Sequence, residues 1–526
     1  MNDPRRRPLP VVLLLSLSAA PALAATCESV SKLALPGTTI VRAQAIPAGP
    51  FTVPEGPPIA DMAAFCRVSG TIKPSNDSDI QFEVWLPASG WNGRFKGFGN
   101  GGFAGSMSLR SLARAVSAGY VAATTDTGHR GEATDASWAL GHPEKVIDFG
   151  YRAIHEMTVA GKAIAAAFYG RPAQHAYFHG CSNGGRQALM EAQRFPADYD
   201  GILAGAPANY WTHLLAQAVW EMQATEGEPA SYIPAAKLPA IEAATIAQCD
   251  AADGVQDGVV DDPSTCRFQP ATLLCAGPES DACLTPPQVG ALEKLYAGPR
   301  IGAKPVHPGL VPGGATGPGS WNLWITGPAP GQSLILTFGH QFFRNMVFQD
   351  PSWDFRRFQL ERDTKVADEK FERVLNATDP DLSAFRQRGG KLILYHGWSD
   401  AAISPLNTIA YYDSVRAKMG TGPADEFVRL FMMPGVQHCD GGPGPAGFFG
   451  RGALRHDAQH DADFTIERWV EEGVAPGPII AAKYKSPSEP ESGLVRTRPL
   501  CPYPQVARYK GQGSTDEAAS FACVDK

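Results

Sequence analysis

Strand-like and helix-like patterns alternate along the first part of the chain. Residues 79–88, 120–126 and 175–180 contain short apolar runs that are typical of strands. Residues 146–170 and 182–196 instead place apolar side chains about every 3.6 positions, as a helix does. Alternation of this kind predicts an α/β fold with a mostly parallel sheet and helices on both faces.

The alternation stops after residue 211 and resumes near residue 384. Residues 212–383 contain an acidic loop, a stretch rich in glycine and proline, and an aromatic stretch. A strand, a helix and a second strand are then predicted across residues 389–442. Because insertions are tolerated at loops that leave a sheet, we predict a core formed by residues 25–211 and 384–526, interrupted by a lid at 212–383.

The first 24 residues have the features of a secretory signal peptide. Three arginines at 5–7 precede an apolar run at 10–24 that ends in the small residues of an A-x-A-like cleavage site. A membrane anchor is the alternative, but the run is short for a bilayer span. We therefore expect a secreted or periplasmic protein without a membrane association after cleavage.

Composition adds limits rather than a function. The chain has 526 residues, of which 44% are hydrophobic and 19% charged, which is ordinary for a globular protein. A net charge of -7 gives no electrostatic reason to expect nucleic acid as a partner. The sequence does not indicate an oligomeric state.

The pentapeptide GCSNG at residues 180–184 matches the G-x-S-x-G pattern of a nucleophile elbow. The pattern alone is weak, and a plain Gly/Ser-rich turn is the alternative. Its context strengthens it, because a predicted strand precedes Ser182 and a predicted helix follows. We interpret Ser182 as a nucleophile presented at the carboxyl edge of the sheet.

A serine nucleophile needs an imidazole base and a carboxylate that orients the base. Asp400 and His438 each follow a predicted strand, in the order acid then histidine that α/β-hydrolases use. Taken singly, either could be an ordinary loop residue. Together with Ser182 they predict a catalytic triad in an α/β-hydrolase fold with a large inserted lid.

Acyl transfer also requires hydrogen-bond donors for the oxyanion. The N–H of Asn183, directly after the nucleophile, is one candidate. The glycine-rich loop after an early strand offers the second, and we choose Gly101 over its neighbour Gly102. A plain turn is the alternative for this loop.

The chain has ten cysteines, and an even number in an exported protein favours disulfides. If Ser182 and His438 touch, the adjacent Cys181 and Cys439 come within disulfide range. Three local pairs would close short loops, although spacing alone leaves other pairings open: Cys249 with Cys266, Cys275 with Cys283, and Cys501 with Cys523. No C-x-x-C pair suggests zinc, and we expect no organic cofactor.

The lid contains aspartates at three- to four-residue intervals between two of these cysteines, at Asp250, Asp253, Asp257 and Asp261. A calcium ion bound by oxygen ligands would relieve the repulsion between the carboxylates. A solvated acidic turn is the alternative. Carbonyl groups such as those of Val255 and Val259 could complete the ligand set of Asp250, Asp253 and Asp257.

Three motifs together resemble the tannase and feruloyl esterase family, which includes mono(2-hydroxyethyl) terephthalate hydrolase. They are GCSNGGRQ at residues 180–187, HGWSD at 396–400 and QHC at 437–439, and the resemblance covers essentially the whole mature chain. It implies Ser182, Asp400 and His438 as the triad, and a structural calcium ion held by Asp250, Asp253, Val255, Asp257 and Val259. It also implies five disulfides, which are Cys27–Cys66, Cys181–Cys439, Cys249–Cys266, Cys275–Cys283 and Cys501–Cys523.

The resemblance implies a small aromatic ester as the substrate. Asn183 stands where relatives often have Thr or Glu, and Ile403 stands where the terephthalate hydrolase has a bulky aromatic residue. We therefore expect phenolic-acid esters, such as feruloyl or galloyl esters, with terephthalate monoesters as the alternative. An aromatic clamp is expected from the lid stretches that contain Trp321, Trp324, Phe342, Phe343 and Arg344. Trp211 and Ile403 are further candidate substrate contacts.

Two rival functions are considered. A peptidase or thioesterase could use the same scaffold, and substrate profiling would distinguish it. A catalytically silent module that binds a phenolic ligand could use the lid alone, and failure of an organophosphonate to label Ser182 would support it.

Overall fold

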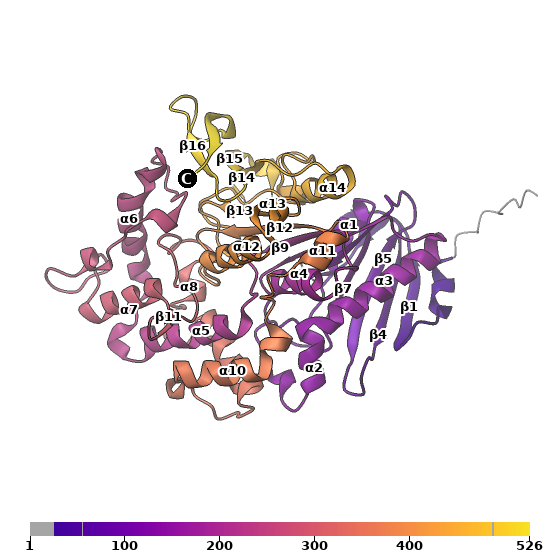
Figure 1. Cartoon of the computed structure of the whole chain (residues 1–526), viewed down its shortest axis with the longest axis horizontal. Helices are drawn as coiled ribbons and strands as arrows, with labels where there is room; N and C mark the ends of the chain where they lie inside the picture. The colour runs from indigo at the N-terminus through magenta and orange to yellow at the C-terminus, as the bar shows by residue number, and fades with distance from the viewer. Residues whose placement is uncertain (1–25, 55, 487–488) are drawn as a thin grey trace, which may run out of the picture.

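The structure is a computed structural model that describes residues 26–54, 56–486 and 489–526. The predicted signal peptide, residues 1–24, lies outside the described residues. A nine-stranded sheet runs through the centre of the molecule (Figure 1). Its strands are β1 (Thr38–Ile46), β4 (Phe65–Ile72), β5 (Ile80–Pro87), β6 (Arg94–Phe98), β7 (Val121–Thr125), β8 (His175–Cys181), β9 (Gly201–Gly205), β12 (Lys391–Gly397) and β13 (Val428–Met433).

The spatial order of the sheet is β1-β4-β5-β7-β6-β8-β9-β12-β13. The pairs from β7 to β13 are parallel, as the alternation predicted. The pairs that join β1, β4, β5 and β7 are antiparallel, and the sequence did not predict β1 or β4. The result is the large mixed sheet of an α/β-hydrolase fold.

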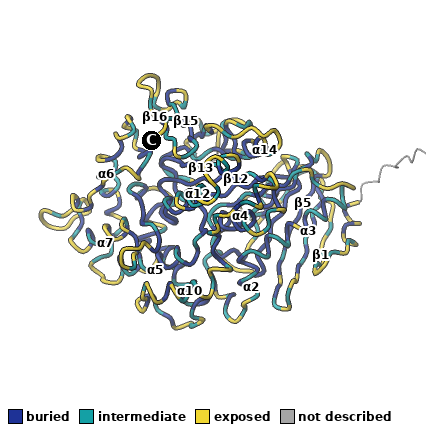
Figure 2. Tube along the Cα trace, viewed as in Figure 1, coloured by how far each residue is buried: buried dark blue, intermediate teal, exposed yellow. Residues whose placement is uncertain are grey.

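Side chains alternate between the two faces of the sheet, which explains why its strands are apolar throughout. Phe178 of β8 and Leu394 of β12 pack in the core beneath one layer of helices, whereas the adjacent Tyr177 and Tyr395 pack in the core on the other face. Successive residues of a strand point to opposite faces, so a strand covered on both sides needs apolar residues at every position. Figure 2 shows the resulting band of buried residues along the centre of the molecule.

Helices cover both faces and build a separate layer beside the carboxyl ends of the parallel strands. The helices are α1 (Leu109–Ser117), α2 (Pro143–Ile147), α3 (Ala153–Tyr169), α4 (Asn183–Arg194), α5 (Trp211–Glu226), α6 (Leu238–Cys249), α7 (Pro286–Ala297), α8 (Trp321–Trp324), α9 (Leu334–Gln341), α10 (Leu360–Leu375), α11 (Ser383–Gln387), α12 (Pro405–Met419), α13 (Thr421–Asp425) and α14 (Ala462–Glu472). One core beneath the sheet contains residues of α3, α4 and α12, and the core on the opposite face contains residues of α14. The helix predicted at 146–170 is formed by α2, a π-helical turn at Asp148–Arg152, and α3.

Helices α5, α6, α7, α8 and α10 lie along the left and bottom of Figure 1. No strand of the nine-stranded sheet falls within residues 212–383. The exact lid boundaries remain a prediction. Among the described residues, no helix is both long and apolar enough to cross a membrane.

Two-stranded hairpins complete the described part of the chain. They are β2 (Gly49–Phe51) with β3 (Ile59–Met62), β10 (Arg300–Ile301) with β11 (Lys304–Pro305), β14 (Ile479–Tyr484) with β15 (Leu494–Leu500), and β16 (Val506–Tyr509) with β17 (Phe521–Val524). The two C-terminal hairpins were not predicted.

Candidate active site

Ser182 lies on a sharp turn between β8 and α4. Its φ angle is 64°, in the left-handed region that non-glycine residues rarely adopt. Close packing explains the glycines around it. A Cβ atom on Gly180 would lie 2.3 Å from the carbonyl oxygen of Gly184, and one on Gly185 would lie 2.2 Å from that of Gly205. The local geometry is therefore that of the predicted nucleophile elbow.

Asp400 follows β12, and its side chain is fully buried. Its Oδ1 accepts hydrogen bonds from the backbone N–H groups of Ala402 and Ile403, at 2.8 and 2.9 Å. Its Oδ2 lies 2.8 Å from Nδ1 of His438. Burial alone would raise the pKa of this carboxyl, but the charge of His438 and the hydrogen bonds from His396 and His438 hold it well below its usual range.

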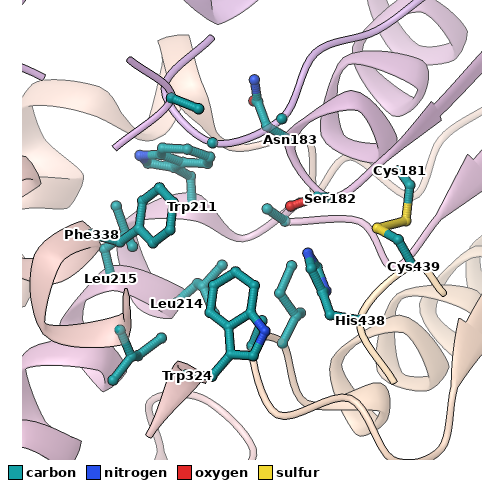
Figure 3. A pocket seen from close by; sticks show the side chains of 17 residues that line it. Cys181, Ser182, Asn183, Trp211, Leu214, Leu215, Trp324, Phe338, His438 and Cys439 are labelled. Carbon is teal, nitrogen blue, oxygen red and sulfur yellow. A yellow bond between two sulfur atoms is a disulfide. The ribbon is translucent and has the colours of Figure 1, made fainter. Parts of the chain in front are cut away.

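His438 follows β13, and its side chain is about 10% exposed. Because Nδ1 faces a carboxylate oxygen, the Nδ1 proton is assigned to this contact, and Nε2 is left to act as a base. Figure 3 shows the imidazole pointing towards the Ser182 hydroxyl. The three residues predicted as a triad are thus brought together at one place.

A second histidine contacts the same carboxylate. Nε2 of His396 lies 3.0 Å from Oδ2 of Asp400, and the side chain is fully buried. The sequence analysis did not assign a role to His396, although it begins the HGWSD motif. The sequence signal for this contact was that His396 and Asp400 are the first and last residues of the HGWSD motif.

The glycine-rich loop after β6 is hydrogen-bonded to α4. The N–H of Asn100 donates to Oε1 of Gln187, and Nε2 of Gln187 donates to Oδ1 of Asn100. Within the described part of the chain, the N–H of Gly101 makes no hydrogen bond. The N–H of Asn183 begins α4 and therefore has no partner within the helix. Gly101 and Asn183 both line the cavity described below, and their role as oxyanion donors stays a prediction.

Arg186 of α4 is fully buried and has no carboxylate partner among its hydrogen bonds. Its guanidinium donates to Oδ1 of Asn183 and to the carbonyl groups of Phe149, Gly150 and Leu375. Burial, with a smaller contribution from the charge of Arg194, lowers the pKa of Arg186 to about 9. Sequence reasoning missed this residue, which connects α4 to the π-helical turn at Asp148–Arg152 and to the end of α10.

Cys181 and Cys439 form a disulfide beside Ser182 and His438, with Cα atoms 6.0 Å apart (Figure 3). The other pairs are Cys27–Cys66, Cys249–Cys266, Cys275–Cys283 and Cys501–Cys523, and no described cysteine is free. These are the five pairs that the family resemblance implied.

A cavity of about 300 Å³ opens above Ser182 and is lined mostly by apolar side chains. Trp211, Trp324 and Ile403 line it, as expected. Sequence reasoning missed four lining residues that come from α5 and α9. They are Leu214, Leu215, Ile335 and Phe338.

The other members of the predicted clamp do not line this cavity. Trp321 is buried and packs against Tyr296, and Phe342 is buried between Phe343 and Phe371. Arg344 is also absent from the lining. Trp321 and Phe342 thus pack in the interior of the lid, and the prediction that they contact the substrate is wrong.

The acidic loop is partly neutralised by two arginines of strand β15. Oδ2 of Asp257 contacts Arg496 at 2.9 Å and also pairs with Arg498. In contrast, both carboxylate oxygens of Asp261 are buried without a hydrogen-bond partner. Burial and neighbouring carboxylates raise the pKa of Asp253 to about 6 and that of Asp261 to about 8.

The fit of these residues to a cation is incomplete. The orphaned Asp261 carboxylate is suited to a nearby positive charge. However, no three His, Cys, Asp or Glu side chains among the described residues are arranged to hold a metal ion. Backbone carbonyls would therefore have to supply part of any ligand set.

Comparison with known proteins agrees with this geometry. The model of the family "Tannase and feruloyl esterase" matches residues 66–524. An uncharacterized esterase of Xanthomonas campestris pv. campestris is 46% identical over 98% of this chain and 95% of its own length. A mono(2-hydroxyethyl) terephthalate hydrolase of Piscinibacter sakaiensis is 36% identical over 88% of this chain and 85% of its own length.

The crystal structure of feruloyl esterase B from Aspergillus oryzae superposes with a TM-score of 0.87 at 30% sequence identity. The match covers 95% of this chain and 99% of that chain. The family match thus spans the sheet from β4 to β13, together with the helices of residues 212–383. The chain therefore belongs to the tannase and feruloyl esterase family and is a carboxylic ester hydrolase with an α/β-hydrolase fold.

Proposed function

We propose that the protein is a secreted serine esterase that hydrolyses esters of phenolic acids through an acyl-enzyme. The observation that carries the proposal is the meeting of Ser182, His438 and buried Asp400 at the floor of an apolar cavity. The strained backbone at Ser182 adds support, because such strain occurs where a site requires it.

The residues can be assigned to the steps of acyl transfer. Oγ of Ser182 attacks the ester carbonyl carbon while Nε2 of His438 takes the hydroxyl proton. Asp400 stabilises the imidazolium through Nδ1, and the N–H groups of Gly101 and Asn183 donate to the oxyanion. His438 then returns the proton to the leaving alcohol. A water molecule releases the acid by the same sequence of steps.

The shape and chemistry of the cavity favour an uncharged aromatic acyl group. Trp324, Phe338 and Trp211 offer ring faces and edges, and aromatic pairs add about 0.5–1.5 kcal/mol beyond the area that they bury. No lysine or arginine is among the residues that line the cavity. A terephthalate monoester would bring a carboxylate without a cationic partner, so we favour hydroxycinnamoyl esters over terephthalate monoesters.

Galloyl esters fit the cavity less well. A galloyl ring carries three hydroxyl groups, each of which loses hydrogen bonds to water on binding. Apart from Ser182, Asn183 and His438, the lining offers few polar side chains to replace them. Feruloyl esters, with one hydroxyl group, are the preferred candidates.

We also propose export from the cytoplasm and a calcium ion at the acidic loop. Five disulfides and the predicted signal peptide support export. The uncompensated carboxylate of Asp261 and the raised pKa of Asp253 support a cation, which would neutralise the loop and stabilise the lid without a part in the chemistry.

Two measurements test the proposal. Ser182→Ala is expected to abolish turnover of methyl ferulate and labelling by an organophosphonate, with an unchanged melting temperature. Full turnover by this variant would refute the serine mechanism. A panel of methyl ferulate, methyl gallate, mono(2-hydroxyethyl) terephthalate and an aryl acetate tests the acyl preference, and the highest kcat/KM on the terephthalate ester would overturn it.

A further inference from the structure

The carboxylate of Asp400 is shared by two imidazoles. Its Oδ2 lies 2.8 Å from Nδ1 of His438 and 3.0 Å from Nε2 of His396. Its Oδ1 is occupied by two backbone N–H groups. The carboxylate therefore has four hydrogen-bond donors around it, and both its position and its rotation are determined.

The surroundings of His396 assign its proton. Nε2 faces Oδ2 of Asp400 and the carbonyl oxygen of Ile403, at 3.0 and 3.1 Å, and both are acceptors only. Nε2 must therefore carry a hydrogen atom. Nδ1 lies 2.7 Å from the hydroxyl of Thr408 on α12, which can donate to it. The neutral imidazole satisfies all of these contacts.

The other neighbours of His396 carry no charge. On one side of β12 its register partner is Met432 of β13, and on the other side β9 ends at Gly205 beside Tyr395. Helix α12 presents Thr408. The titratable groups that face His396 are thus Asp400 and, through the shared Oδ2, His438.

From this arrangement we propose that His396 is a positioning residue for the esterase reaction, which holds Oδ2 of Asp400 against His438 and limits how strongly that oxygen binds the imidazolium. The inference rests on the proposed function of the triad. Each N–H that donates to a carboxylate stabilises its charge and lowers its basicity, so an oxygen that already accepts one N–H is a weaker acceptor for a second one. His396 therefore sets the pH at which His438 becomes available as a base, without touching the substrate itself.

Removal of the His396 donor has two expected consequences. Asp400 gains freedom to rotate, so fewer molecules have the imidazole oriented for Ser182, and kcat falls. The remaining contact between Oδ2 and His438 strengthens, so the imidazole stays protonated to higher pH. A residue that only filled space would change stability without this shift of the pH profile.

Three substitutions separate these effects. His396→Phe keeps a ring but has no donor. His396→Asn keeps an amide near Thr408 but is too short to donate to Asp400. His396→Gln restores a donor near the position of Nε2, so it serves as the matched control.

For His396→Phe and His396→Asn we expect kcat on methyl ferulate to fall about tenfold or more, with KM changed less than about twofold. The acid limb of kcat/KM against pH should move up by about half a unit or more, since an opposite charge that is bound more tightly shifts a titration upward. For His396→Gln we expect kcat within about threefold of that of the parent protein, and an acid limb at its original pH. All rates are referred to sites titrated with an organophosphonate, so that unfolded protein does not count.

The outcomes are distinct from those of the proposed function. Loss of activity in Ser182→Ala, together with an unchanged acid limb in both His396→Phe and His396→Asn, overturns this inference and leaves the serine mechanism standing. The same holds if His396→Gln loses as much activity as His396→Phe. Full activity of Ser182→Ala would overturn the proposed function first.

Discussion

Removal of the disulfide between Cys181 and Cys439 is expected to reduce both stability and turnover. The two cysteines are 258 residues apart in sequence. The loop-entropy relation gives a stabilisation of roughly 5.5 kcal/mol for a loop of this length, as an upper value. The Cys249–Cys266 and Cys275–Cys283 bonds lie inside the loop and shorten it, which lowers the value by only about 0.1 kcal/mol because the dependence on length is logarithmic.

Replacement of both cysteines by alanine is the perturbation, and equilibrium unfolding in urea is the assay. The matched control is the double alanine variant of Cys275 and Cys283, which are only 8 residues apart. The same relation gives about 2.5 kcal/mol for that loop. We expect the long-loop variant to lose more stability and the control to lose less.

The two variants should also differ in activity. Cys181 and Cys439 adjoin Ser182 and His438, so their loss frees the two loops to separate. We expect kcat to fall about tenfold or more in the long-loop variant, since small misplacements of reacting groups cost factors of this size. The control should keep its turnover. Equal losses of stability in the two variants, or full activity without the active-site disulfide, would refute the reasoning.

Two further predictions concern the lid. Because the pKa of Asp261 is raised to about 8 in the folded protein, the folded state binds more protons than the unfolded state between about pH 4 and pH 8, and calcium-free protein should lose stability as pH rises through this range. Chelation should therefore lower the melting temperature more at pH 8 than at pH 5. Asp261→Asn should reduce the difference between the two pH values. A fall in melting temperature that is the same at both pH values would contradict the explanation. Trp324→Ala should raise KM for methyl ferulate about tenfold, equivalent to roughly 1.4 kcal/mol of binding, with little change in melting temperature. Trp321→Ala should instead cost about 3–5 kcal/mol of stability and leave KM unchanged. Calorimetry and steady-state kinetics measure both quantities for the two variants, and a raised KM in Trp321→Ala or a large loss of stability in Trp324→Ala would contradict the assignment.

The central strands could be predicted from sequence because both of their faces are covered. Strands β7, β9 and β12 therefore consist of short apolar runs that periodicity identifies. Strand β1 lies at the edge of the sheet, and most of its residues are exposed or only partly buried. Its pattern is correspondingly weak, which explains why β1 was not predicted.

The triad residues could be chosen because elbow, acid and base each follow a strand in a fixed order. The lining of the cavity could not be chosen in the same way. Trp321 and Trp324 are only three residues apart in α8, and both are large and apolar. One packs against Tyr296 in the lid and the other against Phe338 at the cavity. Only the packing of distant segments distinguishes them, so composition alone assigned both to the substrate.

The order of the strands explains why the loop that carries His438 depends on contacts with other strands to hold its position. Strand β13 is three strands away from β8, which at about 4.8 Å per strand corresponds to ~14 Å. The Cα atoms of Cys181 and Cys439 are nevertheless only 6.0 Å apart, so the loop after β13 must return across β12 and β9. A Cβ atom on Gly397 would lie 2.2 Å from the carbonyl oxygen of Val436, which shows how closely this loop crosses the end of β12.

Such a crossing leaves the imidazole on a loop that begins after Met433, rather than on a rigid strand. Its position then depends on what the loop contacts along its path. Asp400 and its partner His396 hold the loop from β12, and the disulfide holds it from β8. These two supports reach His438 from two different strands. Loss of either one should therefore lower kcat while the other still keeps the base near Ser182, and loss of both should lower kcat by more than the product of the single effects.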